Sequence, residues 1–184
     1  MLFQGRSRPV IGLDITTSSI KLIELSRSGD GYRVESYAAE PSPPNAINEK
    51  AIVDSQAVGE AVRRAVKRAG ARSKECAVAI SGDAAITKVI QMPRNLREAE
   101  LESQVEMQAD QYIPFPMEEV SFDFEVIGPS EKDPEMLDVL LVATRSENVE
   151  QRQAAVNAAG LLTRIVDVEA FALENACRLL THQM

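Results

Sequence analysis

Residues 10–26, VIGLDITTSSIKLIELS, decide the fold class of this chain. An apolar run that contains one carboxylate, Asp14, leads into four consecutive hydroxyl side chains, residues 16–19, and a second apolar run starts at Ile20. Continuous apolar runs are typical of buried strands, and a short polar stretch between two of them predicts a hairpin. Ser, Thr and Asp are also ordinary turn residues, so the stretch alone is compatible with a plain polar turn.

The elements that follow this hairpin indicate its wider fold. A glycine-containing turn precedes a third strand at residues 32–38, and a proline-rich connection leads to a helix at residues 55–69 that Gly70 ends. A short apolar strand, residues 77–80, comes next. Three meandering strands, a helix and another strand form the opening half of a ribonuclease H-like α/β fold.

A block with its own apolar pattern then interrupts that fold. It reads as a strand at residues 84–93, a helix that Pro114 stops, and two further strands at 120–128 and 137–145. The helix carries an apolar stripe that includes Leu101, Val105, Ala109 and Tyr112, and the alternating strand VSFDFEVIG places Phe122 and Phe124 on its inner face. The order strand, helix, strand, strand predicts an inserted subdomain.

The remaining residues return the chain to its first core. Ser146 can cap a helix that Gly160 ends, and an apolar strand and a last helix follow it. We therefore expect a core lobe made of residues 7–83 and 161–184, and an inserted subdomain of residues 84–160.

The amino-acid composition argues against some classes of function. The 184 residues are 45% hydrophobic and 26% charged, which is ordinary for a globular protein. Twenty basic and 28 acidic residues give a net charge of -8, which argues against a nucleic-acid partner because phosphate contacts need clustered Lys and Arg. Cys76 and Cys177 form no metal-binding spacing, so we expect two free, buried thiols. The start, MLFQG, resembles a tag protease site and is left out of the fold prediction.

Two classes of protein with this opening half place a carboxylate at the end of the first strand. In a metal-dependent nuclease, Asp14 needs acidic partners to hold two cations, and Glu60 and Asp83 are the natural candidates. In an actin-like ATPase, the carboxylate acts through water on magnesium, and the following turn wraps the nucleotide phosphates with amides and hydroxyls. The four hydroxyls favour the second class.

Five stretches carry a family resemblance. They are GLDITTSSIKLIELS (12–26), YAAEPSPPNAI (37–47), AVAISGDAAITKVIQMP (77–93), ADQYIPFPMEEVSFDFEV (109–126) and VDVEAFALENA (166–176). Together they resemble the PilM family of actin-like proteins in type IV pilus assembly, and the likeness runs from about residue 10 to residue 180. The PilM family is in turn similar to the division protein FtsA, which has an insertion at the same position.

The resemblance implies a fold and a nucleotide site. The fold is an actin-like, ribonuclease H-like α/β core with the inserted subdomain, and this chain matches the first of the family's two lobes. Asp14 is expected near magnesium through water, and Lys21 is expected to point back toward the phosphates as their cationic partner. The residues implied at the phosphates and the metal are Asp14, Thr16, Thr17, Ser18, Ser19 and Lys21. Since the second lobe would supply the adenosine pocket, we expect no tight ATP binding by this chain and no catalytic residue in it.

The resemblance also implies partners. The family's role is that of a cytoplasmic scaffold, peripheral at the bacterial inner membrane. It is expected to bind the N-terminal cytoplasmic tail of the membrane protein PilN in a groove between the core lobe and the inserted subdomain. Pilus motor ATPases are further partners that the resemblance implies. An FtsA-like division protein and the nuclease remain the alternatives, and exposed lobe surface leads us to expect self-association.

Overall fold

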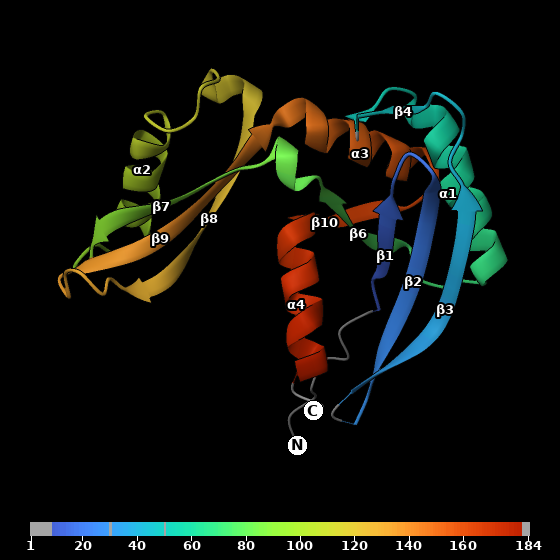
Figure 1. Ribbon diagram of the computed structural model, residues 1–184, viewed down its shortest axis with the longest axis horizontal. Coiled ribbons are helices and arrows are strands. Elements are labelled where there is room, and N and C mark those ends of the chain that lie inside the picture. Colours follow the sequence, from blue (N-terminus) through green and yellow to red (C-terminus); the bar gives the residue numbers. More distant parts are fainter. Residues whose placement is uncertain (1–8, 30, 50, 182–184) are drawn as a thin grey trace. The chain divides into compact units, whose positions relative to one another are not determined.

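In the computed structural model, residues 9–29, 31–49 and 51–181 are described, and the chain divides into two compact units (Figure 1). The first unit holds the chain up to Ser81 and from Glu150 onward, and the second holds Gly82–Val149. The MLFQG start lies outside the described residues.

A five-stranded sheet organises the first unit. Strands β1 (Ile11–Ile15), β2 (Ser19–Ser28) and β3 (Gly31–Pro41) form the predicted antiparallel meander. Strand β6 (Glu75–Ile80) pairs with β1 in parallel, and β10 (Leu162–Val168) pairs with β6 in parallel. The order across the sheet is β10-β6-β1-β2-β3. This is the mixed sheet expected of a ribonuclease H-like half.

Helix α1 (Ser55–Ala69) supplies much of the core of this unit. Its start is fixed by the Asp54 carboxylate, which accepts the Ala57 N–H at 2.9 Å, and its end by Gly70 at φ 65°. Alternate side chains of β1 and β2 pack with the apolar side of the helix. The largest fully buried side chains of this core include Ile11, Ile20, Leu22, Ile52, Val58 and Val62.

The remaining elements of the first unit are short strands and two helices. Strands β4 (Ile47–Asn48) and β5 (Ala51–Ile52) form a small ladder before α1. Helix α3 (Ser146–Ala158) precedes β10, and helix α4 (Glu169–Thr181) follows it. Cys76 is buried as expected, but Cys177 on α4 is exposed, because most of that helix faces away from the core. Both thiols are free.

The second unit has the predicted order of strand, helix, strand, strand. Strand β7 (Ile86–Pro93) is followed by α2 (Glu98–Ala109), β8 (Val120–Pro129) and β9 (Met136–Arg145), with single 3-10 turns at Gly82–Ala84 and Met117–Glu119. Its antiparallel sheet has the order β7-β9-β8. Phe122 and Phe124 pack against the core of this unit, as their sequence pattern predicts, and Phe115 packs there as well.

Helix α2 ends earlier than expected. The prediction ran to Pro114, but the helix stops at Ala109, whose carbonyl accepts the N–H groups of both Tyr112 and Ile113. The chain thus forms a separate tight turn between the end of α2 and Pro114. Tyr112, assigned to the apolar stripe, is therefore exposed, and Ile113 is buried in its place.

The second unit also ends earlier than the predicted insertion, at Val149 rather than residue 160. The physical reason lies in α3, whose later residues pack with the first unit. Ala155 and Val156 are fully buried in its core, and the Arg152 Nε donates to the Ala79 carbonyl at 2.6 Å. The sequence predicts a helix and its cap, but it does not show which of the two cores buries the side chains of that helix.

Candidate functional site

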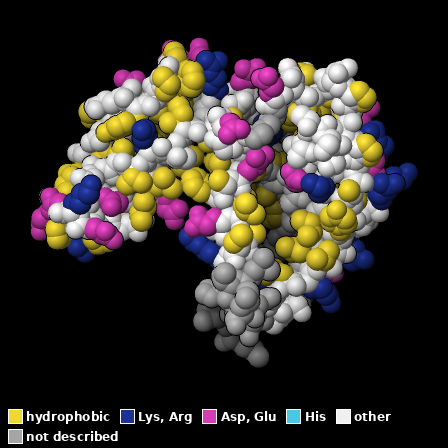
Figure 2. All heavy atoms as spheres, in the orientation of Figure 1, with side chains coloured by type: hydrophobic (Ala, Val, Ile, Leu, Met, Phe, Trp, Pro, Cys, Tyr) yellow, Lys and Arg dark blue, Asp and Glu magenta, His cyan; other side chains and the backbone are white. Residues whose placement is uncertain are grey.

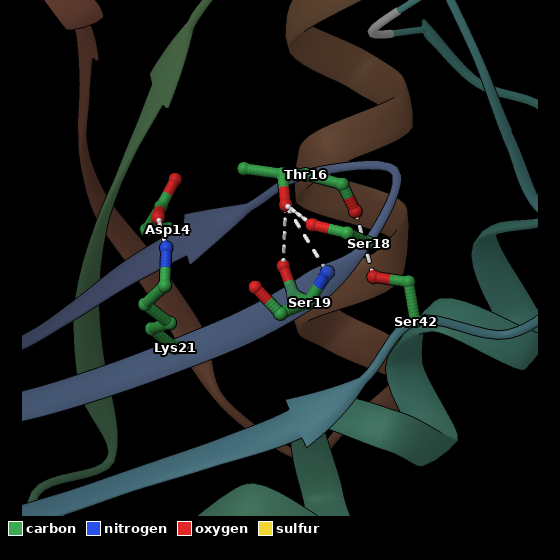
Figure 3. Close-up of polar contacts among 6 residues, drawn as sticks. All are labelled: Asp14, Thr16, Ser18, Ser19, Lys21 and Ser42. Atoms are coloured by element: carbon green, nitrogen blue, oxygen red, sulfur yellow. Dashed lines mark hydrogen bonds and ion pairs between the residues drawn. The ribbon is translucent and has the colours of Figure 1, made fainter.

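The hydroxyl stretch forms a tight, internally bonded turn between β1 and β2 (Figure 3). Thr16 closes it: its N–H donates to the Ser19 carbonyl at 3.0 Å, and its hydroxyl donates to the same carbonyl at 2.9 Å. The Thr16 Oγ1 also accepts the Ser19 N–H at 3.1 Å and lies 3.3 Å from the Ser18 Oγ. One threonine therefore satisfies both backbone groups of Ser19 and fixes the shape of the turn.

A residue from outside the hairpin secures the turn. Ser42, directly after β3, donates its hydroxyl to the Thr16 carbonyl at 2.6 Å and its N–H to the Ser18 carbonyl at 3.2 Å (Figure 3). Sequence reasoning missed Ser42. The only signal available was a serine next to Pro41, and its relevance depends on the register that sets Pro41 opposite Ser19.

The exposed part of the turn presents donors. Thr17 and Ser18 are exposed, and their N–H groups donate to no other described residue. Ser42 engages the carbonyls of Thr16 and Ser18, so these two acceptors are already used within the protein. Successive backbone N–H groups in a turn form a concavity that suits an anion such as phosphate.

Asp14 and Lys21 face each other across the two strands. They are direct partners in the β1–β2 register, and the Lys21 Nζ lies 2.8 Å from the Asp14 Oδ2. The hydrogen bond and the negative charge of Asp14 raise the pKa of Lys21 above its ordinary value. Both side chains are about half exposed, at 50% and 47%, so the pair adds little to stability but keeps a carboxylate and an ammonium together.

The hairpin thus brings together all six predicted site residues. Asp14 and Lys21 alternate with Leu13, Ile20 and Leu22, which point into the core, so the charged pair lies on the other face of the sheet. In this structure the Lys21 ammonium is paired with the Asp14 carboxylate.

The acidic set of the nuclease alternative is not assembled. Glu60 is an exposed residue of α1 whose carboxylate lies by the Gln56 amide, and Asp83 belongs to the second unit. Across residues 9–29, 31–49 and 51–181, no group of three or more His, Cys, Asp or Glu side chains is placed to hold a metal ion.

The mixed sheet, its meander and the inserted subdomain define an actin-like fold. The family model described as type IV pilus assembly protein PilM matches residues 12–184, and the chain belongs to that family.

Solved structures agree with this assignment. A structure described as the PilM-PilN type IV pilus biogenesis complex is 31% identical to this chain with a TM-score of 0.80, and the match covers 91% of this chain and 49% of that one. The cytoplasmic domain of EpsL, an inner membrane component of the type II secretion system of Vibrio cholerae, shares the fold at 14% identity and a TM-score of 0.56, over 86% of this chain and 57% of its own. The chain thus spans about half the length of these relatives.

None of the helices in the described ranges is both long enough and apolar enough to cross a bilayer.

Proposed function

We propose that this chain is the partner-binding lobe of an actin-like scaffold in the type IV pilus assembly platform, and that it binds the cytoplasmic N-terminal tail of a PilN-type membrane protein. The observation that carries the proposal is the match to a PilM-PilN complex over 91% of this chain. The scaffold would act at the cytoplasmic side of the inner membrane, where pilus motor ATPases are further candidate partners.

A peptide titration tests the partner. A fluorescent peptide that copies the N-terminal tail of a PilN protein is titrated with the chain, and a scrambled peptide of equal composition is the control. We expect saturable binding of the first peptide alone, with the same affinity with and without Mg-ATP. Equal binding of both peptides, or binding that requires Mg-ATP, would contradict the proposal.

We infer that the β1–β2 turn is one half of a nucleotide site in the intact protein. These residues fit ATP with magnesium. The amides of Thr17 and Ser18 and the neighbouring hydroxyls suit phosphate oxygens. The exposed Asp14 carboxylate suits a hydrated magnesium ion. Bound ATP with magnesium would supply the phosphate charge that such a turn stabilises. Ser42 positions the turn by engaging two of its carbonyls.

Calorimetry tests this site in two proteins. For the chain alone we expect no binding of Mg-ATP at micromolar affinity, because one turn supplies only part of a site. For the intact protein we expect that Asp14→Ala weakens magnesium-dependent binding, while Glu60→Ala, a matched loss of an exposed carboxylate, leaves it unchanged. Micromolar binding by the chain alone would overturn the first expectation, and equal affinities of the two variants would overturn the second.

A further inference from the structure

The three-stranded sheet of the second unit has two faces, and only one is covered within the described part of that unit. Helix α2 lies against the first face, where Val105 packs with Met92 and Leu141 in the core of the unit. The side chains that alternate with these strand residues point to the opposite face, which we call the outer face. Its central positions are Thr87, Val89, Asp123, Glu125, Leu140 and Val142.

Three of the central positions of the outer face carry apolar side chains. A sheet with one face in water normally alternates apolar residues inward with polar residues outward. Here Val89 is 56% exposed, and Leu140 and Val142 are partly exposed. The register makes Val89 the direct neighbour of Leu140, so these side chains form a continuous apolar strip. Figure 2 shows hydrophobic side chains, in yellow, over the region of this sheet.

Carboxylates flank the strip along β8. The same register sets Glu125 beside Leu140 and Asp123 beside Val142, at the edge of the sheet opposite Val89. Both acids are exposed, and the Asp123 carboxylate accepts the N–H of its neighbour Phe124 at 2.9 Å. An apolar strip with an acidic rim suits a partner that carries apolar side chains in the middle and positive charge at one side.

The charge of the chain is concentrated in this unit. Residues 82–149 contain 5 basic and 15 acidic side chains, a net charge of -10, whereas the other residues contain 15 basic and 13 acidic ones, a net charge of +2. A potential of this sign steers a basic partner toward the second unit and repels an anionic membrane surface. Charge complementarity therefore selects the class of partner.

We propose that the outer face of the second unit is a docking surface for a basic amphipathic helix of another protein. A helix is the form of occupant that the sheet already accepts, because the 12-residue α2 covers the other face in the same way. Its apolar side would cover Val89, Leu140 and Val142, and its Lys or Arg side chains would lie beside Asp123 and Glu125. This site goes beyond the proposed function, which concerns an extended tail and a phosphate turn.

The probe for the test is a helical peptide of about three turns, with leucine on one side and lysine on the other. Its affinity for the whole chain is measured by fluorescence anisotropy at about 0.15 M salt. We expect saturable binding, and no binding of the same peptide with glutamate in place of lysine. Absence of binding by the lysine peptide, or equal binding of both peptides, would overturn the proposal.

Matched charge reversals locate the site. Asp123→Lys with Glu125→Lys should weaken binding of the lysine peptide by about tenfold or more, since the rim becomes repulsive. Glu102→Lys with Glu106→Lys changes the net charge equally, but on exposed positions of α2, and should weaken binding by less than about twofold because salt screens distant charges. Equal losses of affinity in both double variants would mean that only the net charge of the chain matters, and would refute a specific binding site on the outer face.

An uncharged variant tests the apolar strip. Val89→Thr keeps the shape and the strand preference of the side chain but replaces one methyl group with a hydroxyl, and we expect about fivefold weaker binding of the lysine peptide. Circular dichroism and thermal unfolding check that each variant remains folded. Unchanged affinity in the folded Val89→Thr variant would contradict the proposal. Binding of anionic lipid vesicles that is lost with the same variant would assign the face to a membrane and overturn the choice of partner.

Discussion

Glu24 shows how a single buried charge holds the first unit together. It lies on β2 and is only 4% exposed, yet its carboxylate accepts three hydrogen bonds: from the Ser36 hydroxyl at 3.2 Å, the Arg72 N–H at 3.3 Å and the Ser73 N–H at 3.0 Å. Two of these donors belong to the loop between α1 and β6. The carboxylate therefore fixes that loop by accepting the N–H groups of two of its residues.

We expect Glu24→Gln to lower the free energy of unfolding by about 2 kcal/mol. The two loop N–H groups donate to different carboxylate oxygens, and the NH2 that replaces one of these oxygens cannot accept a hydrogen bond. Urea denaturation followed by circular dichroism measures the change. Glu60→Gln removes a charge from an exposed helix position and is the control, with an expected change within about 0.5 kcal/mol. Similar losses in both variants would show that the hydrogen bonds of Glu24 do not stabilise the loop.

The ion pair of the turn gives a second prediction at this scale. Asp14 raises the pKa of Lys21 through a hydrogen bond and its charge, so Asp14→Asn should return that pKa toward its ordinary value. Any stabilisation from the pair is present at neutral pH and is lost as the pH rises through the raised pKa of Lys21. NMR titration of the Lys21 side chain measures the shift. An identical titration curve in both proteins would mean that the pair does not form in solution.

Helices α1 and α3 approach each other closely where they cross. A Cβ atom built at Gly59 would lie 2.5 Å from the Ala158 Cβ and 2.7 Å from the Ala155 carbonyl oxygen. Both distances are too short for real contacts, so the crossing needs a glycine at this place. The requirement is one of space rather than of backbone conformation, because Gly59 lies within a regular helix.

We expect Gly59→Ala to destabilise the chain by about 1–3 kcal/mol, because the added methyl group forces the two helices apart. The sign is informative, since alanine in an open helix position would stabilise by up to about 1 kcal/mol. Gly82→Ala is the control, because a Cβ there meets nothing within 4 Å. Thermal unfolding of the two variants measures the difference, and a stabilised Gly59→Ala protein would contradict the close crossing.

At the scale of the whole molecule, the first unit exposes several large apolar side chains. Two of the three tyrosines, Tyr32 and Tyr37, are 49% and 58% exposed on the edge strand β3. Figure 2 shows hydrophobic side chains over the region of β2 and β3 and on α4. The exposed apolar residues of β3, β10 and α4 are Tyr32, Val34, Tyr37, Leu162, Ile165, Leu173 and Leu179. Patches of this kind on one unit usually mark interaction surfaces.

We expect the chain to self-associate reversibly as its concentration rises, because burial of these side chains between copies removes apolar area from water. Size-exclusion chromatography with light scattering, from tenths of a milligram to several milligrams per millilitre, measures the mass. Tyr37→Ser and Leu173→Ser should shift the onset to higher concentration. A constant monomer mass across the range would contradict the expectation.

The sequence by itself determined the order of the elements and the location of the candidate site. Apolar alternation and helix caps are local signals, so they predicted β1, β2, α1 and the order of the second unit. Asp14, Lys21 and the hydroxyls between them are neighbours along one hairpin, and a hairpin brings its residues together without help from the rest of the chain.

Only the tertiary structure decided the features that depend on residues far apart in sequence. Ser42 reaches Thr16 across 26 positions, Glu24 reaches Ser73 across 49, and Gly59 meets Ala158 where two helices cross. The end of α2 at Ala109 and the outer face of its sheet belong to the same group, since packing and strand register set them. Each of these contacts depends on strand register or helix packing, and one sequence carries no local signal for either.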